Sequence, residues 1–276
     1  MPKNEAQNRP AASMVQRQER KKIRHGVIAL VVLVLAVSGL AVLFRWLDHR
    51  FFERNARFTL RRIDIQSTGY WGRSNATRAD LARFLNLAVG ENNLFALSPA
   101  AIRGQLTSIP NIADAAVERV LPDTLEIRIQ ERVPRAWLGS TVSGLVVDAN
   151  AKVMRSDQCF GVHNGLPLIV GLRGKVRVGT RLTEVQGALD FLMMVLRNMP
   201  EIQLQIISVS QPDRYTVGMK YRTRRSFQVI LPRPVTAELL DEMNSALAET
   251  VRCNDSRSTI NLLNGGSAVL QPAPGR

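Results

Sequence analysis

The first feature in the pattern of hydrophobic and polar positions is an uninterrupted apolar run. Residues 26–44 hold 19 residues without a charged side chain. As a helix, a run of this length covers roughly 28 Å, close to the thickness of a bilayer's hydrocarbon core. We therefore expect a transmembrane helix over 26–47, between a polar tail at 1–25 and a charged connector at 48–57.

Two other interpretations of this run stay open. A buried core helix would need a polar face, which the run lacks. A cleaved signal peptide would need a cleavage site of small residues, and Ala36-Val37-Ser38 resembles one. The apolar run continues through Phe44, further than a signal peptide requires.

The second pattern, over residues 58–131, combines strand and helix periods. Residues 60–66 predict a strand with Ile63 and Ile65 on one face. A helix is expected to begin at Thr77, with Asp80 completing a capping box, and a second at Ser98. The expected inner faces of these helices are Leu81, Phe84 and Leu85, and then Ala101, Ile102, Leu106 and Ile109.

Two strands complete this unit, at 115–120 and 124–131, around a turn at 121–123. In the second strand Leu125, Ile127 and Ile129 alternate with polar residues, so one face is expected to be buried. The predicted order is β-α-α-β-β, a two-layer α+β domain with both helices on one face of the sheet.

The third pattern, over residues 132–271, is rich in strands with two amphipathic helices. A hairpin is expected at 144–148 and 151–154, around a turn at Asp148–Ala151 that lacks glycine. Three strands are expected at 204–210, 215–221 and 226–231. The helices are expected at about 183–200, opened by a Thr183–Gln186 capping box, and at about 236–252. Their predicted core residues are Val185, Ala188, Leu189, Leu192, Met193 and Leu196, and then Leu239, Leu240, Met243, Ala246, Leu247 and Val251.

A final hairpin is expected at 258–263 and 267–270. Asn264-Gly265-Gly266 between the two runs is a strong hairpin signal. Residues 272–276 are expected to form a flexible tail. The fold class is therefore α+β, a single transmembrane helix followed by a β-α-α-β-β domain and a mixed β-sheet domain with flanking helices.

Composition restricts the chemistry. The net charge is +14, and the basic cluster before the apolar run favours a cytoplasmic N-terminus. Basic residues do not interleave with aromatics, so we expect no nucleic acid partner. No phosphate-binding loop, dinucleotide motif or nucleophile elbow is present, and His163 with Cys159 makes a poor metal pair. We expect no catalytic residue, no cofactor and no metal; bonding between Cys159 and Cys253 stays open.

Residues 117–137 resemble a family pattern. A strand, a proline turn at Pro122, an alternating strand and then Glu131-Arg132-Val133-Pro134, followed by Ala136-Trp137, are similar to the FtsQ/DivIB family of bacterial division proteins. Asn93-Leu94-Phe95 and Leu106-x-x-Ile109-Pro110 also fit. The resemblance implies a polypeptide-transport-associated (POTRA) domain at 58–131 and a C-terminal β domain at 132–271.

The resemblance also implies a function. It indicates a non-enzymatic, single-pass divisome scaffold in the inner membrane, with a cytoplasmic N-terminus and periplasmic domains, enriched at the septum. Expected partners are FtsB-like and FtsL-like proteins at the last hairpin, with FtsK- or FtsW-like proteins near the POTRA domain and the anchor. The family's strand-addition edge corresponds here to Ile260, Asn261, Leu262, Leu263, Ser267, Ala268 and Val269.

Three alternatives accompany this interpretation. An anchored POTRA-type adaptor in secretion or outer-membrane assembly is the first, and a wall-modifying enzyme is the second. An ordinary edge hairpin, protected by its own tail, is the third. The sequence suggests Leu262→Glu as a test, which should abolish partner capture without unfolding the domain.

Overall fold

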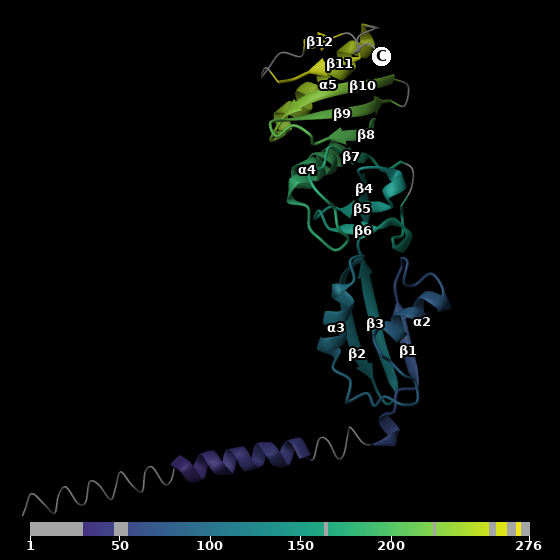
Figure 1. The fold of residues 1–276 in the computed structure, drawn as a ribbon, viewed down its shortest axis with the longest axis vertical. Coiled ribbons are helices and arrows are strands. Elements are labelled where there is room, and N and C mark those ends of the chain that lie inside the picture. Colours follow the sequence, from purple (N-terminus) through teal and green to yellow (C-terminus); the bar gives the residue numbers. More distant parts are fainter. Residues whose placement is uncertain are drawn as a thin grey trace, which may run out of the picture.

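The computed structural model describes residues 30–46, 55–162, 165–222, 225–253, 258–263 and 269–271. Residues 30–46 form a helix (Figure 1). Within the described ranges, no helix has the length and apolar character needed to cross a membrane. Residues 26–29 and 47 of the predicted span lie outside those ranges, as do the tail, residues 48–54 of the connector and residues 272–276. The transmembrane helix stays a prediction.

The first folded unit is a three-stranded sheet with two helices (Figure 1). β1 is parallel to β3, which is central, and β2 runs antiparallel along the other side of β3. The core is formed by Leu81 from α2, by Leu85 directly after it, by Ile102 and Leu106 from α3, and by strand residues such as Ile127. The elements are η2 Ala56–Phe58, β1 Arg62–Gln66, α2 Asn75–Phe84, α3 Pro99–Ser108, β2 Ile112–Val120 and β3 Thr124–Glu131.

Local sequence signals account for much of this unit. The Ser98 side chain caps α3, and Pro99 takes its first turn, as predicted. Along β3, Leu125, Ile127 and Ile129 are all buried, which confirms the predicted alternation.

Three details of the helices were predicted wrongly. Ser74 caps α2, and Thr77, the third residue of the helix, is its partner in the capping box. The helix therefore begins earlier than expected. Phe84 is 53% exposed, because α2 turns Leu81 toward the core, with Leu85 buried directly after the helix. Ala101 is exposed, since α3 rests on Ile102 and Leu106.

The second unit is a nine-stranded mixed sheet in the order β12-β11-β10-β9-β8-β7-β4-β5-β6. Buried residues of α4 and α5 share one hydrophobic core with the strands, so both helices cover the same face of the sheet (Figure 1). The strands are β4 Pro134–Leu138, β5 Leu145–Asp148, β6 Val153–Arg155, β7 Leu168–Val170, β8 Ile202–Ser208, β9 Arg214–Tyr221, β10 Arg225–Pro232, β11 Thr259–Asn261 and β12 Val269–Gln271. The helices are η3 Thr141–Ser143, η4 Ser156–Gln158, α4 Thr183–Asn198 and α5 Ala237–Arg252.

The turn without glycine is built by a carboxylate. The Asp148 side chain accepts backbone N–H bonds from Asn150 at 2.9 Å and Lys152 at 2.8 Å. These bonds hold Ala151 at a φ of 58°, a left-handed conformation that usually favours glycine. The β5–β6 hairpin predicted here is confirmed.

The two long helices differ from prediction in their caps and faces. No side chain caps α4, so the predicted Thr183–Gln186 capping box is wrong. Phe191 and Val195 are buried on α4, whereas Leu196 is 53% exposed, so the core face is rotated from the expected one. On α5, Val251 is 37% exposed.

Polar contacts join the two units. The Trp71 indole N–H donates to Asn111 Oδ1 at 3.2 Å, and the Asn111 amide donates to the Gln158 carbonyl. Arg132 Nη1 lies 2.8 Å from Asp148 Oδ2, and both side chains are largely buried. The two units are therefore held together by side-chain contacts as well as by the chain between β3 and β4.

Candidate functional site: the outer strand of the nine-stranded sheet

The candidate site lies where the nine-stranded sheet ends in β12. β11 is parallel to β10 and antiparallel to β12, with Ile260 opposite Leu270 and Asn261 opposite Val269. Because β11 is paired on both sides, the unpaired backbone of this end belongs to β12. No strand among the described residues pairs with its outer side.

The opposite end of the sheet is closed by the chain itself. The Val153 N–H of β6 donates to the Thr180 carbonyl at 2.9 Å, and the Gly179 N–H donates to the Val153 carbonyl at 2.9 Å. Lys152 and Arg181 form a further bridge. An edge covered this way cannot accept another strand, so the two ends of the sheet are not equivalent.

The predicted site residues divide into two groups. Ile260 and Leu262 are 0% and 1% exposed and belong to the core beneath the edge, with α5 residues such as Leu240 and Leu247. The Asn261 side chain accepts the Leu263 N–H at 3.0 Å and shapes the end of β11. Val269 lies in β12, whereas Ser267 and Ala268 lie outside the described residues, as do Asn264-Gly265-Gly266.

Two residues of the outer strand were not among the predicted site residues. Leu270 and Gln271 complete β12, and neither they nor Val269 carries a charge. The sequence signal for them is the continuation of the hairpin toward Pro272, which cannot donate to a ladder. The buried position of Leu262 also changes the test that the sequence suggested, because Leu262→Glu would place a carboxylate in the core.

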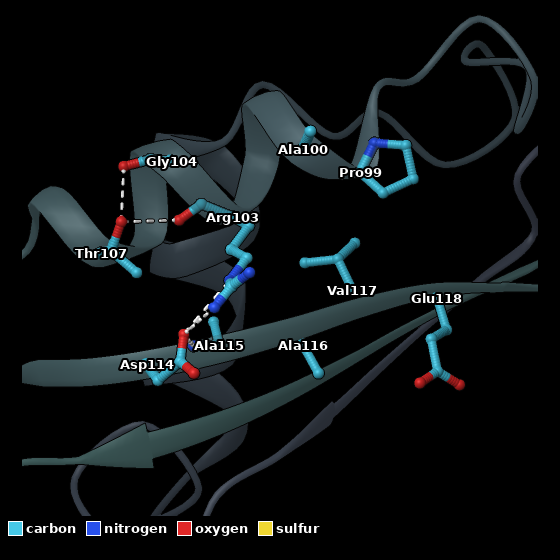
Figure 2. Close-up of a pocket in the computed structure, with 10 residues that line it drawn as sticks. All are labelled: Pro99, Ala100, Arg103, Gly104, Thr107, Asp114, Ala115, Ala116, Val117 and Glu118. Carbon is cyan, nitrogen blue, oxygen red and sulfur yellow. Dashed lines mark hydrogen bonds and ion pairs between the residues drawn. The ribbon is translucent and has the colours of Figure 1, made fainter.

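In the three-stranded sheet β1 and β2 are the edge strands, and no strand among the described residues pairs with the outer side of either. β2 lies beside an open hollow of about 680 Å³ between α3 and β2 (Figure 2). Arg103 reaches across this hollow, with its Nη2 2.8 Å from Asp114 Oδ1. That hydrogen bond lowers the pKa of the Asp114 carboxyl below its usual value.

The β2 edge carries features that discourage strand addition. Asp114 and Glu118 are charged, and the register of β2 shifts between Ile112 and Asp114. Charges and bulges on an edge are common defences against pairing with another chain. The outer strand β12 has no charged residue, so it is the better candidate for pairing with a partner.

The described residues offer little for catalysis. They contain no group of three or more His, Cys, Asp or Glu that could hold a metal ion. Burial raises the pKa of the Cys159 thiol to about 12, so this sulfur is not a ready nucleophile. The three histidines lie outside the described residues. What the outer edge can do chemically is form backbone hydrogen bonds.

Comparison with known proteins agrees with this architecture. The family model of the FtsQ-type POTRA domain matches residues 60–132. The chain is 28% identical over 158 residues to a protein of Koribacter versatilis named cell division protein FtsQ. It is 33% identical over 119 residues to a protein of the same name from Novosphingobium aromaticivorans. Residues 60–132 therefore form an FtsQ-type POTRA domain, and the chain is similar to proteins named cell division protein FtsQ.

The similarity covers part of each protein. The alignments include 56% and 41% of this chain, and 43% and 36% of the two relatives. The matched stretch therefore spans less than half the length of either curated relative. The match of the family model to residues 60–132 identifies the first unit as an FtsQ-type POTRA domain.

Proposed function

We propose that this protein is a membrane-anchored, non-enzymatic scaffold of bacterial cell division. The single observation that carries the proposal is the uncharged outer strand β12, whose outer side pairs with no strand of the described residues, in a chain with an FtsQ-type POTRA domain. An unpaired edge binds an extended segment mainly through backbone hydrogen bonds, with side chains supplying specificity. Such an edge gathers proteins and requires no catalytic group.

The proposal includes an orientation. The apolar run at 26–47 is the anchor, the tail at 1–25 lies in the cytoplasm, and both folded units lie in the periplasm. The partner at β12 is an FtsB-like protein, accompanied by an FtsL-like protein. FtsK- or FtsW-like membrane proteins contact the POTRA domain and the anchor. Through these contacts the protein recruits and regulates septal wall synthesis.

The residues of β11 and those of β12 have separate roles in this proposal. Ile260 and Leu262 fix β11 to the core, and thereby hold β12 at the rim of the sheet. Val269, Leu270 and Gln271 present the ladder to the partner. Substitutions in the first group should damage folding, and substitutions in the second group should damage binding.

A proline scan of β12 tests the proposal. Successive residues of a strand point their N–H groups to alternate sides, so proline at one parity removes only an outward N–H. For proline at the positions with an outward N–H, we expect capture of the FtsB-like protein from the same genome to fall at least tenfold, without a change in melting temperature. Proline at the alternate positions, whose N–H groups point toward β11, should disturb the pairing of β12 with β11 as well.

Glu118→Gln and Asp114→Asn, on the β2 edge, are the matched controls and should leave capture unchanged. Unchanged capture by every stably folded proline variant would refute β12 as the docking edge.

A further inference from the structure

One end of the POTRA domain lies near the point where the chain leaves the helix at 30–46 (Figure 1). Only residues 47–54 separate Trp46 from Asn55, and an extended chain of that length spans about 30 Å. The described part of the domain begins there with η2, followed by β1. A membrane that holds the helix at 30–46 would therefore lie close to the η2 end of the POTRA domain.

The turn between β2 and β3 lies at the same end. The backbone N–H groups of Arg61 and Arg62 donate to the Asp123 carbonyl at 2.8 and 3.2 Å. The neighbouring residues Val120 and Leu121 are 44% and 58% exposed. Two apolar side chains are thus presented to the exterior beside the start of β1.

Basic side chains flank these apolar residues. Arg57, Arg61 and Arg62 are exposed, and none forms an ion pair with a carboxylate of the described residues. By contrast, Arg119 is already engaged, since it donates to the carbonyls of Leu94 and Leu97 and lies over the Phe95 ring. We call Arg57, Arg61, Arg62, Val120 and Leu121 the proximal surface.

We propose that the proximal surface binds an anionic lipid bilayer and holds the POTRA domain against the membrane. Apolar side chains inserted at the headgroup boundary, flanked by arginines that meet lipid phosphates, are the usual means of peripheral attachment. The inference rests on the proposed anchor, because the anchor keeps this surface near the bilayer.

The consequence concerns the docking edge. The nine-stranded sheet lies at the opposite end of the POTRA domain, with β12 farthest from η2 (Figure 1). A POTRA domain fixed at the bilayer would hold β12 at a defined height above the membrane. A partner anchored in the same membrane would then meet the edge only through a segment that reaches this height.

Fluorescence of the full chain in lipid nanodiscs tests the inference. Leu121→Cys, in a Cys159→Ser/Cys253→Ser background, carries an environment-sensitive dye. We expect a blue shift in discs containing phosphatidylglycerol and little shift in phosphatidylcholine alone. Each arginine near an anionic surface is expected to shift the docked-to-undocked ratio about fivefold. Arg57→Glu/Arg61→Glu should therefore abolish the shift.

Two controls match this design. Dye at Val142→Cys, a residue 95% exposed in the other unit, should show no lipid-dependent shift. Arg73→Glu/Arg177→Glu, both exposed and away from the proximal surface, makes the same change in net charge and should keep the Leu121 shift. Absence of the shift in a chain that stays in the disc would overturn the inference.

The anchor has its own readout. A chain that leaves the bilayer under alkaline washing would refute the proposed anchor. In that case, flotation with phosphatidylglycerol vesicles still decides the inference. Weaker flotation of the Arg57→Glu/Arg61→Glu variant than of the unsubstituted protein supports it, and equal flotation of the two overturns it. Capture of the FtsB-like protein through β12 should be unaffected by these arginine substitutions in detergent.

Discussion

The Asp148 carboxylate connects the turn of the β5–β6 hairpin to the segment that enters the nine-stranded sheet. It accepts Arg132 Nη1 at 2.8 Å and the N–H groups of Asn150 and Lys152. Its side chain is 6% exposed and that of Arg132 is 19% exposed. Removing it would leave a partly buried guanidinium without its carboxylate and two turn N–H groups without their acceptor.

We expect Asp148→Ala to lower the free energy of unfolding by about 3–5 kcal/mol, the usual cost of breaking a buried ion pair on one side. At about 2–4 °C per kcal/mol for a chain of this size, the melting temperature should fall by roughly 10 °C. Asp148→Asn keeps an oxygen for the turn N–H groups and loses the charge, so about 1–2 kcal/mol is expected.

Urea unfolding followed by circular dichroism, in mild detergent, measures these differences. Asp157→Asn is the control, because its ion pair with Arg155 has both side chains 58% exposed and should contribute less than about 1 kcal/mol. A free energy of unfolding for Asp148→Ala within about 1 kcal/mol of that of the unsubstituted protein would show that the carboxylate does not hold this junction.

Three further substitutions and measurements follow from the structure. Leu262→Glu should destabilise the C-terminal unit by more than the roughly 2–5 kcal/mol of a buried Leu→Ala change, measured by thermal melting; a stable variant would contradict the burial of this side chain. Iodoacetamide at pH 8.5 should modify the exposed Cys253 well before Cys159, whose pKa is raised to about 12; mass spectrometry of peptides resolves the two, and equal rates would contradict the burial of Cys159. Gly171→Ala should destabilise strongly, because its φ is +81° and an added Cβ would lie 2.7 Å from the Ser210 backbone nitrogen; equal urea midpoints for variant and parent would contradict this.

Patterns of local chemistry determined the elements of this protein. The alternation of Leu125, Ile127 and Ile129 predicted β3 with its correct buried face, since side-chain direction in a strand follows sequence position directly. Ser98 before Pro99 likewise predicted the start of α3. These signals depend on neighbours in sequence, so a single sequence is sufficient to read them.

Helix faces were harder to predict because several apolar residues compete for one core. Phe84 and Leu196 fit a helical stripe but are exposed, while Phe191 is buried at 0% exposure. Which apolar residue points inward depends on the rotation of the helix against its sheet, and that rotation is set by packing with distant strands. The cap of α2 at Ser74 is a case in which two overlapping signals competed.

The candidate edge shows the same division. The sequence by itself determined a last hairpin in a chain resembling the FtsQ/DivIB family. Only the tertiary structure decided that β11 pairs with β10 and is therefore interior, while β12 is the rim. Strand order depends on contacts between segments far apart in the chain, which alternation does not encode. For this reason Ile260 and Leu262, expected at the docking edge, lie in the core beneath it.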